Sequence, residues 1–356
     1  MKRKQKILLC GFANHPNAQN INCSAIARYL DKTKFEVHAF CFSGLPLERA
    51  SFVGVALHPV SVRRGWARLI PIRMFWRMFV GRYDVLYMPK MMSTDRLFAR
   101  WFGKRKCLVC SQESVVTDTV SNDPERRAYF ASMTAVFAIS RCIQISVEKY
   151  WGTRCPLLYL GHECPSFGLP RKSVRTVAYV GNIKENKRPL LFLECARAFP
   201  ELRFLMIGDG VMEGDVKSYI SEHGLTNVTL TGRIPNAEVY QQLRQVDLLL
   251  MTSQNEGLPK VMLEAASCAI PTVYINECYS VDYIEDGNTG YAVPDIDRMI
   301  ATIRLLCHDS ILFSRLSQNV LEMSRQYHWS KVIGGYERFF EEAFLMWEKA
   351  QDPRRT

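Results

Sequence analysis

The chain has 356 residues, a length that favours two domains of ordinary size. With 48% hydrophobic and 23% charged residues it can bury substantial cores, which excludes a disordered chain. No uninterrupted apolar stretch reaches the ~18 residues that a membrane-spanning helix needs, so we do not expect an integral membrane protein.

The net charge of +11 is unevenly distributed. Residues 1–172 contain 27 Lys and Arg against 11 Asp and Glu, a net charge of +16, whereas residues 173–356 contain 19 against 24, a net charge of −5. A basic half joined to an acidic half predicts that one half meets a polyanion or an anionic surface. No recognition motif or base-stacking aromatic ladder accompanies the positive charge, so we expect no nucleic acid as partner and favour an anionic membrane surface.

The first half alternates short β-rich runs with helical runs. Its basic start, residues 1–6, and the apolar residues 7–13 predict a first strand rather than a secretion signal, because no small-residue cleavage site follows. Strands are expected at 6–10, 35–42, 55–60, 83–88, 107–110 and 135–139, and helices at 21–30, 71–80, 94–102, 124–132 and 141–151.

The second half repeats this alternation after residues 161–173, whose Pro, Gly and Cys content predicts a linker. Strands are expected at 176–180, 203–207, 228–230, 248–251 and 272–274, and helices at 189–198, 212–223, 238–246, 259–267, 298–306 and 336–349.

Near-continuous apolar strands separated by amphipathic helices are typical of parallel sheets covered on both faces. We therefore predict an α/β fold with two doubly wound Rossmann-like domains, residues 1–165 and 174–328. A C-terminal helix in residues 329–356 follows, with packing back toward the first domain as one option. Ligands of such sheets bind at the carboxyl ends of the strands, so two sheets that face each other would form a cleft.

One basic helical run, residues 71–80, predicts a membrane-binding helix. At about 100° per residue, Arg73 and Arg77 lie within ~40° of each other, and apolar side chains lie on the other side. This pattern is typical of an interfacial helix that binds phosphates through arginine and buries an apolar face, here with Trp76 and Phe79, in a leaflet. The alternative is a core helix whose arginines face water.

The 12 cysteines show no repeating framework. Cys107 and Cys110 form a C-x-x-C pair within a predicted strand, where positions i and i+3 point to opposite faces. We therefore expect reduced thiols and no metal site.

The densest chemical signal is the segment 253–264, which directly follows a predicted strand. Gly257 permits a tight turn, and Pro259 suits the first turn of a helix. The helix is then expected to begin with free backbone N–H groups at Gly257, Leu258 and Lys260. Such groups form an anion site that suits a diphosphate.

Two carboxylates flank this predicted anion site. Glu256 lies just outside the helix, and Glu264 lies ~7.5 Å along the helix axis from Pro259. Carboxylates accept hydrogen bonds from hydroxyl groups, so the pair predicts a ligand with a diphosphate between a sugar and a ribose. The alternative is that Glu256 caps the helix and Glu264 is an ordinary helical residue.

The spacing of Glu256 and Glu264, with Gly257-Leu258-Pro259 between them, resembles the E-x7-E motif of the retaining glycosyltransferases of family four, which have the glycosyltransferase B fold. Other segments resemble the same family, and together the resemblance covers roughly residues 174–307. These segments are residues 179–182 with Lys187, 204–210, 230–233, 265–273 and 285–291.

The resemblance implies a role for several residues. Glu264 would hold the ribose hydroxyls of a nucleotide-sugar, Glu256 would contact the sugar and orient its anomeric carbon, and Lys187 would neutralise the diphosphate. A fixed cation and helix N–H groups would stabilise the departing nucleoside diphosphate without a metal. The motifs add a set of donor-binding positions: Gly257, Leu258, Asn182, Gly181, Gly208 and Arg233.

The chain departs from the family at three places. Asn182 stands where the family usually has an arginine, and the first loop has Asn17 and its neighbours where the family often has a Gly-Gly pair. Glu113 follows a predicted strand where the family frequently places a histidine. Glu113 and Asn17 are therefore candidates for contact with the acceptor or the sugar, and the alternative for Glu113 is an exposed loop residue.

These implications predict a retaining glycosyltransferase that uses a UDP- or GDP-linked sugar and needs no cofactor. The acidic second domain would bind the donor, and the basic first domain would bind a lipid-linked or growing surface saccharide. Such a protein would be cytoplasmic and peripheral at the inner face of the membrane. Two alternatives remain open: a nucleotide-sugar epimerase of the same fold, and a catalytically inactive module that binds a carrier.

Overall fold

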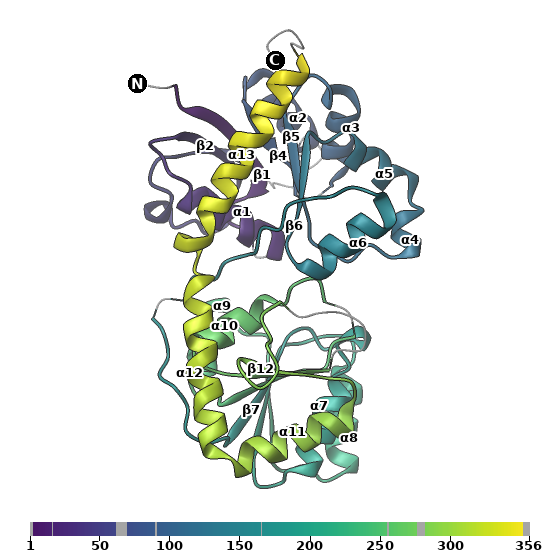
Figure 1. Ribbon diagram of the computed structural model, residues 1–356, viewed down its shortest axis with the longest axis vertical. Coiled ribbons are helices and arrows are strands. Elements are labelled where there is room, and N and C mark those ends of the chain that lie inside the picture. Colours follow the sequence, from purple (N-terminus) through teal and green to yellow (C-terminus); the bar gives the residue numbers. More distant parts are fainter. Residues whose placement is uncertain are drawn as a thin grey trace. The chain divides into compact units, whose positions relative to one another are not determined.

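The computed structural model describes residues 3–15, 17–61, 70–89, 91–164, 166–254, 256–275 and 282–351 (Figure 1). The chain divides into two compact units, of which the first comprises Met1–Gly161 with Trp329–Thr356 and the second comprises His162–His328. Within the described ranges, no helix is long and apolar enough to cross a membrane.

The described part of the first unit is built on a six-stranded parallel sheet with the order β3-β2-β1-β4-β5-β6. In the central strand β1, Ile7 pairs with Val37 of β2 on one side and with Val85 of β4 on the other. The strands are β1 (Gln5–Phe12), β2 (Phe35–Ser43), β3 (Val55–Ser61), β4 (Val85–Tyr87), β5 (Leu108–Gln112) and β6 (Ala135–Ala138). The helices are α1 (Ala18–Tyr29), η1 (Arg49–Phe52), α2 (Ile70–Val80), α3 (Ser93–Phe102), α4 (Asp118–Ser121), α5 (Pro124–Ala131), α6 (Arg141–Trp151) and α13 (Trp329–Gln351).

Helices cover both faces of this sheet, because alternate residues of each strand point to opposite sides. Leu86 of β4 packs in one core cluster with Met78 of α2 and Phe98 of α3. Its neighbour Tyr87 packs against Phe340 of α13, with ring centroids 5.9 Å apart. The C-terminal helix α13 is therefore part of the first unit (Figure 1).

The described part of the second unit has a six-stranded parallel sheet with the order β12-β11-β10-β7-β8-β9. Its core includes Phe192 and Phe204, whose rings meet edge to face at 5.3 Å. The strands are β7 (Thr176–Val180), β8 (Arg203–Ile207), β9 (Val228–Gly232), β10 (Leu248–Met251), β11 (Thr272–Ile275) and β12 (Gly290–Val293). The helices are η3 (Glu185–Lys187), α7 (Pro189–Ala198), α8 (Glu213–Glu222), α9 (Asn236–Leu243), α10 (Lys260–Ser267), α11 (Ile296–His308) and α12 (Ser310–Gln326).

Both units have the doubly wound strand order, which confirms the predicted α/β class with two Rossmann-like domains. The chain reverses its winding direction between β1 and β4 in the first unit and between β7 and β10 in the second. Parallel sheets of this kind bind ligands outside the carboxyl ends of the strands at this switch point. In each unit, a ligand site is therefore expected outside the carboxyl ends of the two strands at the switch point.

Candidate functional site

Two glycines let the loops that follow β7 and β8 approach each other closely. Gly181 has φ 156° and Gly208 has φ 139°, and the N–H of Gly181 donates to the carbonyl of Ile207 at 2.9 Å. A Cβ atom at Gly208 would lie only 1.9 Å from the carbonyl oxygen of Gly181. Gly208 therefore requires glycine, because both its backbone angle and this contact exclude a side chain, whereas at Gly181 the backbone angle alone favours glycine.

The structure brings Lys187 and Glu256 together at the switch point of the second unit. Lys187 ends the short helix η3 after β7, Glu256 follows β10, and their side chains form an ion pair with exposed fractions of only 21% and 15%. A second hydrogen bond joins the two segments, since the hydroxyl of Thr252 after β10 donates to the backbone carbonyl of Lys187 at 2.7 Å. The two residues predicted to be catalytic thus share one site.

Helix α10 begins at this ion pair. Pro259 is its N-cap residue, and no side chain makes a capping hydrogen bond there. In the described part of the chain, no group accepts a hydrogen bond from the backbone N–H of Gly257 or Leu258. Unsatisfied N–H groups and the positive end of the helix dipole favour an anion at this point.

Glu264 lies in the middle of α10 and is half-buried. Burial raises the pKa of its carboxyl group above the ordinary value, and Lys260 one turn earlier lowers it in part. Burial and then the charge of Glu264 raise the pKa of Tyr240 in α9, which identifies Tyr240 as a neighbour. Within the described ranges nothing donates a hydrogen bond to the Glu264 carboxylate, so ligand hydroxyl groups would satisfy it.

Two further predicted donor-site residues are exposed. The side chain of Asn182 faces solvent, while its backbone carbonyl accepts a hydrogen bond from the hydroxyl of Tyr179 at 2.8 Å. Arg233 follows β9, the edge strand that lies two strands from β7. Both residues lie at the carboxyl edge of the sheet, since Asn182 follows β7 and Arg233 follows β9.

In the first unit, Asn17 caps helix α1. Its side chain accepts a hydrogen bond from the N–H of Asn20 at 2.9 Å, and the side chain of Asn20 accepts from the N–H of Phe12 at 2.8 Å. The oxygen of the Asn17 side chain is thus engaged in holding the first loop. This finding favours a structural role for Asn17 over the predicted contact with a ligand.

Glu113 lines a pocket of about 260 Å³ at the carboxyl edge of the first sheet. The hydroxyl of the buried Tyr87 donates to Ser111 at 3.0 Å, and Ser111 donates to the Glu113 carboxylate at 2.9 Å. Glu113 is therefore positioned by a hydrogen-bonded chain and is half-buried rather than a freely exposed loop residue. The pocket walls are Gln19, Met88, Pro89, Met91, Ser111, Gln112, Glu113, Ser114, Arg126, Tyr129 and Phe130. Sequence reasoning missed most of them, since they come from four separate segments.

Helix α2 presents an apolar and partly basic surface. Trp76 is 63% exposed and Phe79 45% exposed, and Arg73 faces solvent. The neighbouring helix α3 adds Leu97 and Trp101, which the sequence analysis did not identify. The feature of the sequence that could have identified them is their spacing of four residues within a predicted helix.

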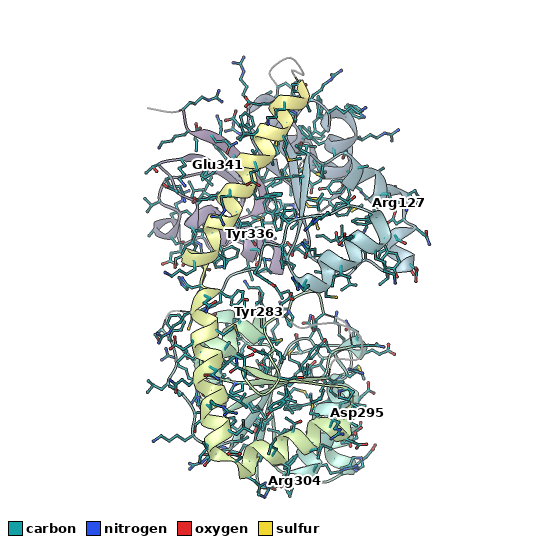
Figure 2. The ribbon with its side chains drawn as sticks, viewed as in Figure 1. Arg127, Tyr283, Asp295, Arg304, Tyr336 and Glu341 are labelled. Atoms are coloured by element: carbon teal, nitrogen blue, oxygen red, sulfur yellow. The ribbon has the colours of Figure 1, made fainter. Side chains whose placement is uncertain are left out.

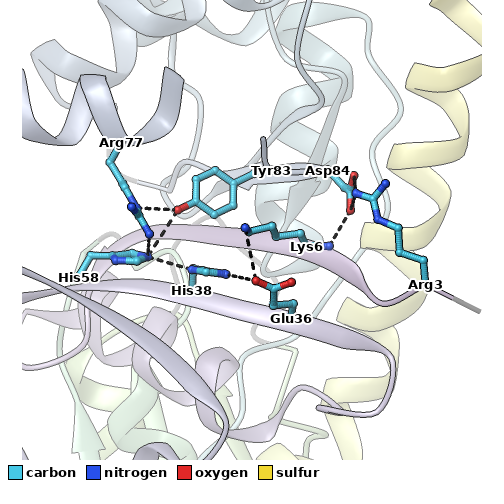
Figure 3. A network of polar contacts seen from close by, with 8 residues as sticks. All are labelled: Arg3, Lys6, Glu36, His38, His58, Arg77, Tyr83 and Asp84. Carbon is cyan, nitrogen blue, oxygen red and sulfur yellow. Dashed lines mark hydrogen bonds and ion pairs between the residues drawn. The ribbon is translucent and has the colours of Figure 1, made fainter. Parts of the chain in front are cut away.

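Arg77 does not share the solvent-facing position of Arg73, which corrects the prediction that both arginines bind phosphates. Its guanidinium donates to the hydroxyl of Tyr83 at 3.0 Å and to the ring of His58 at 3.2 Å (Figure 3). Burial and then the charge of Arg77 lower the pKa of His58 to about 4, so this ring is a neutral acceptor. Arg77 fixes α2 to β3 and is unsuited to binding lipid.

The described cysteines are all free, and those of the C-x-x-C pair are buried. Burial raises the pKa of Cys107 to about 12 and also raises that of Cys110 well above its ordinary value. Within the described ranges, no group of three or more His, Cys, Asp and Glu side chains could hold a metal ion.

Comparison with solved structures defines the fold class. The structure of HepE from Anabaena in complex with UDP superposes with a TM-score of 0.77 over 95% of this chain and 100% of that chain, at 15% identity. The lipopolysaccharide outer core galactosyltransferase WaaB superposes with a TM-score of 0.69 over 96% of this chain and 100% of that chain, at 17% identity. The chain thus has the glycosyltransferase B fold.

Comparison of sequences supports a family for the second unit. Residues 167–323 match the family model described as Glycosyl transferases group 1. An uncharacterised glycosyltransferase of Methanocaldococcus jannaschii is 24% identical over 144 residues, which are 40% of this chain and 41% of that protein. An α-1,3-galactosyltransferase of Escherichia coli is 28% identical over 182 residues, which are 48% of this chain and 43% of that protein. The match spans less than half the length of these two relatives.

Proposed function

We propose that this chain is a retaining glycosyltransferase, which transfers a sugar from a UDP-linked donor to a hydroxyl group of a lipid-linked or growing surface saccharide. The observation that carries the proposal is the ion pair of Lys187 and Glu256 at the start of α10, with Glu264 in the same helix. The family match over residues 167–323 supports the class of reaction.

The donor would occupy the switch point of the second unit. Its diphosphate would accept hydrogen bonds from the backbone N–H groups of Gly257 and Leu258 and displace Glu256 from Lys187. Glu256 would then contact the sugar, and Glu264 would accept hydrogen bonds from the ribose hydroxyls. The cation and the helix start would stabilise the negative charge that develops on the departing diphosphate.

The compared proteins favour a uridine nucleotide and a lipid-linked acceptor. HepE is described in complex with UDP and with UDP-glucose. The Escherichia coli relative is named for transfer from UDP-Gal to α-D-GlcNAc-diphosphoundecaprenol. In the present chain, the first unit would bind the acceptor, with Glu113 in contact with an acceptor hydroxyl.

Thermal unfolding with nucleotide-sugars tests the donor assignment. UDP-glucose should raise the unfolding midpoint of the full chain more than GDP-mannose or ADP-glucose does, because a bound ligand stabilises the folded state by mass action. The shift and the turnover should both be lost in the double variant Glu256→Ala, Glu264→Ala. Turnover that survives in this variant would contradict the proposal. An epimer formed from the donor without any acceptor would instead indicate an epimerase.

We also propose that the first unit binds an anionic membrane surface through α2 and α3. Trp76 and Trp101, which are 63% and 61% exposed, would enter the interfacial region of the leaflet. Cations accompany them: Arg73 is exposed, and a groove of about 1310 Å³ beside Trp101 is also lined by Arg100 and Lys104. Aromatic and cationic groups on one surface suit anionic lipid head groups.

Vesicle sedimentation tests this second part. Trp76→Glu and Arg73→Glu should each weaken binding to phosphatidylglycerol vesicles, by about 1 kcal/mol or more for the loss of the arginine charge. The matched control is Ile311→Glu in α12, since Ile311 is an 82% exposed apolar residue of the second unit. Equal binding of all these variants would overturn the membrane assignment.

A further inference from the structure

The pocket that contains Glu113 also contains an arginine that the proposed mechanism does not use. Arg126 lies in the first turn of α5, where its backbone N–H is held by the side chain of Asp123 at 3.2 Å. Arg126 is half-buried, and its Nε atom is fully covered. Arg126 and Glu113 thus line the same pocket of about 260 Å³.

The guanidinium of Arg126 lacks a partner among the residues that the structure describes. No described group accepts a hydrogen bond from its Nε atom, and Arg126 makes no side-chain ion pair there. The neighbouring Arg96 differs, because it pairs with Glu125. The covered Nε cannot be reached from the pocket, whereas the two terminal nitrogens are not covered and have no acceptor among the described residues, so a ligand in the pocket can accept hydrogen bonds from them.

The chemistry of this acceptor follows from the shape and surroundings of the guanidinium. Its planar set of N–H donors matches the oxygens of a carboxylate or a phosphate. Tyr129, which also lines the pocket, is buried, and its hydroxyl donates to the carbonyl of Met88 at 2.8 Å.

We infer that this pocket binds an acidic saccharide, in which Arg126 holds an oxyanion substituent and Glu113 accepts a hydrogen bond from a ring hydroxyl. The oxyanion is a uronate carboxylate or a sugar phosphate. The inference rests on the proposed function only in assigning this saccharide as the acceptor, and it narrows that acceptor to an acidic class. The same pocket, at the switch point of the first unit, then selects the acceptor by charge.

Three monosaccharide probes test the inference by isothermal titration of the full chain without any donor. Methyl β-D-glucuronide and glucose 6-phosphate each carry an oxyanion, and methyl β-D-glucoside does not. At least one acidic probe should bind about tenfold or more tightly than the glucoside, as expected for a charge-assisted hydrogen bond. Preference for the glucuronide would identify a carboxylate, and preference for the phosphate would identify a phosphoryl group.

Variants assign the effect to one side chain. Arg126→Gln should reduce the affinity for the acidic probe to that for the glucoside, and Arg126→Lys should restore only part of the preference, since lysine lacks the planar donor set. The matched control is Arg127→Gln, because Arg127 is the next residue of α5 and is exposed (Figure 2). Equal affinities for all three probes, or a preference that survives Arg126→Gln, would overturn the inference.

The nucleotide response separates this inference from the proposed function. Arg126→Gln should keep the thermal shift caused by UDP-glucose, which also shows that the variant is folded. If wild-type chain shows no UDP-glucose shift but retains the charge preference that Arg126→Gln abolishes, the glycosyltransferase assignment fails and the acidic-saccharide site stands. If the wild-type chain shows the UDP-glucose shift but no preference for the acidic probes, the acidic-saccharide site is refuted and the glycosyltransferase assignment stands.

Discussion

Replacement of Glu264 by glutamine should stabilise the ligand-free protein and weaken its binding of nucleotide. Glu264 is half-buried in α10, and burial raises the pKa of its carboxyl group. A carboxylate that lacks hydrogen-bond donors in such a place destabilises the folded state, whereas a glutamine of the same shape carries no charge. Residues at binding sites commonly show this opposition between stability and function.

The pH dependence of this effect has a defined sign. Because the pKa of Glu264 is higher in the folded chain than its ordinary value of 4.5, the folded state keeps a proton that the unfolded state loses. The contribution of Glu264 to the free energy of unfolding therefore falls as the pH rises above 4.5. Ribose hydroxyls that donate to the carboxylate would lower its pKa again, so UDP binding should release a proton and tighten with rising pH in this range.

The size of the affinity loss follows from the hydrogen bonds removed. A hydrogen bond to a charged group contributes ~1.5–3 kcal/mol, so the loss of one such bond weakens UDP binding roughly 10- to 150-fold. The expected gain in stability moves the unfolding midpoint upward by about 2–4 °C for each kcal/mol relieved in a domain of this size.

Calorimetric titration of UDP in two buffers with different ionisation enthalpies measures both the affinity and the proton release, and a thermal scan of ligand-free protein measures the stability. The matched control is Glu222→Gln in α8, which removes an exposed carboxylate from the same unit and should change neither quantity. Wild-type affinity in Glu264→Gln, or a lower unfolding midpoint, would refute the reasoning.

Three further substitutions test other parts of the structure. Lys187→Ala should lower turnover on the order of a hundredfold. The double variant Lys187→Ala, Glu256→Ala should lose less activity than the two single losses combined, because each single variant leaves one charge of the pair unpaired and the double variant leaves none. Additive losses in this double-mutant cycle would contradict the prediction. Gly208→Ala should destabilise the chain by ~1–3 kcal/mol in urea titrations, since its Cβ would meet the Gly181 carbonyl at 1.9 Å; an unchanged midpoint would be unexpected. Phe340→Ala should cost ~3–5 kcal/mol by leaving a cavity, and hydrogen exchange should show faster opening of β4 than of β8; equal acceleration in both strands would argue against separate units.

Much of the fold could be predicted because its strands are short apolar runs between amphipathic helices. The strand β10 has the predicted bounds 248–251, since all four of its residues are apolar and buried. The edge strand β12 (Gly290–Val293) was not predicted, because it has only four residues, begins with glycine and has two half-buried residues at its centre. Helix α12 was also missed, although Asp309 caps it and its apolar residues recur at helical spacing.

The start of α13 shows where packing overrides local preference. The prediction placed this helix at 336–349, after Gly334 and Gly335, each of which lowers helix propensity by about 1 kcal/mol. The helix instead runs through both glycines from Trp329. Trp329 is fully buried and Tyr336 donates to the carbonyl of Tyr159 at 3.1 Å, so tertiary contacts hold the first two turns (Figure 2).

The candidate sites were predictable only where one short segment carries them. Glu256 and Glu264 lie in a single strand-turn-helix segment, so their spacing was visible in the sequence. The pocket around Glu113 was not visible, because Arg126 reaches it from a helix that no motif marks. Arg77 illustrates the opposite case: helical periodicity placed it beside Arg73, but contacts with Tyr83 and His58 from other elements turn it inward.

Hydrogen exchange of the full chain with and without UDP tests most directly whether the start of α10 binds a diphosphate. UDP should slow exchange in peptides that cover 181–188, 208–210 and 256–264, and the backbone N–H groups of Gly257 and Leu258 should gain protection, because they acquire an acceptor. Protection confined to other segments, or no protection at saturating UDP, would contradict the account.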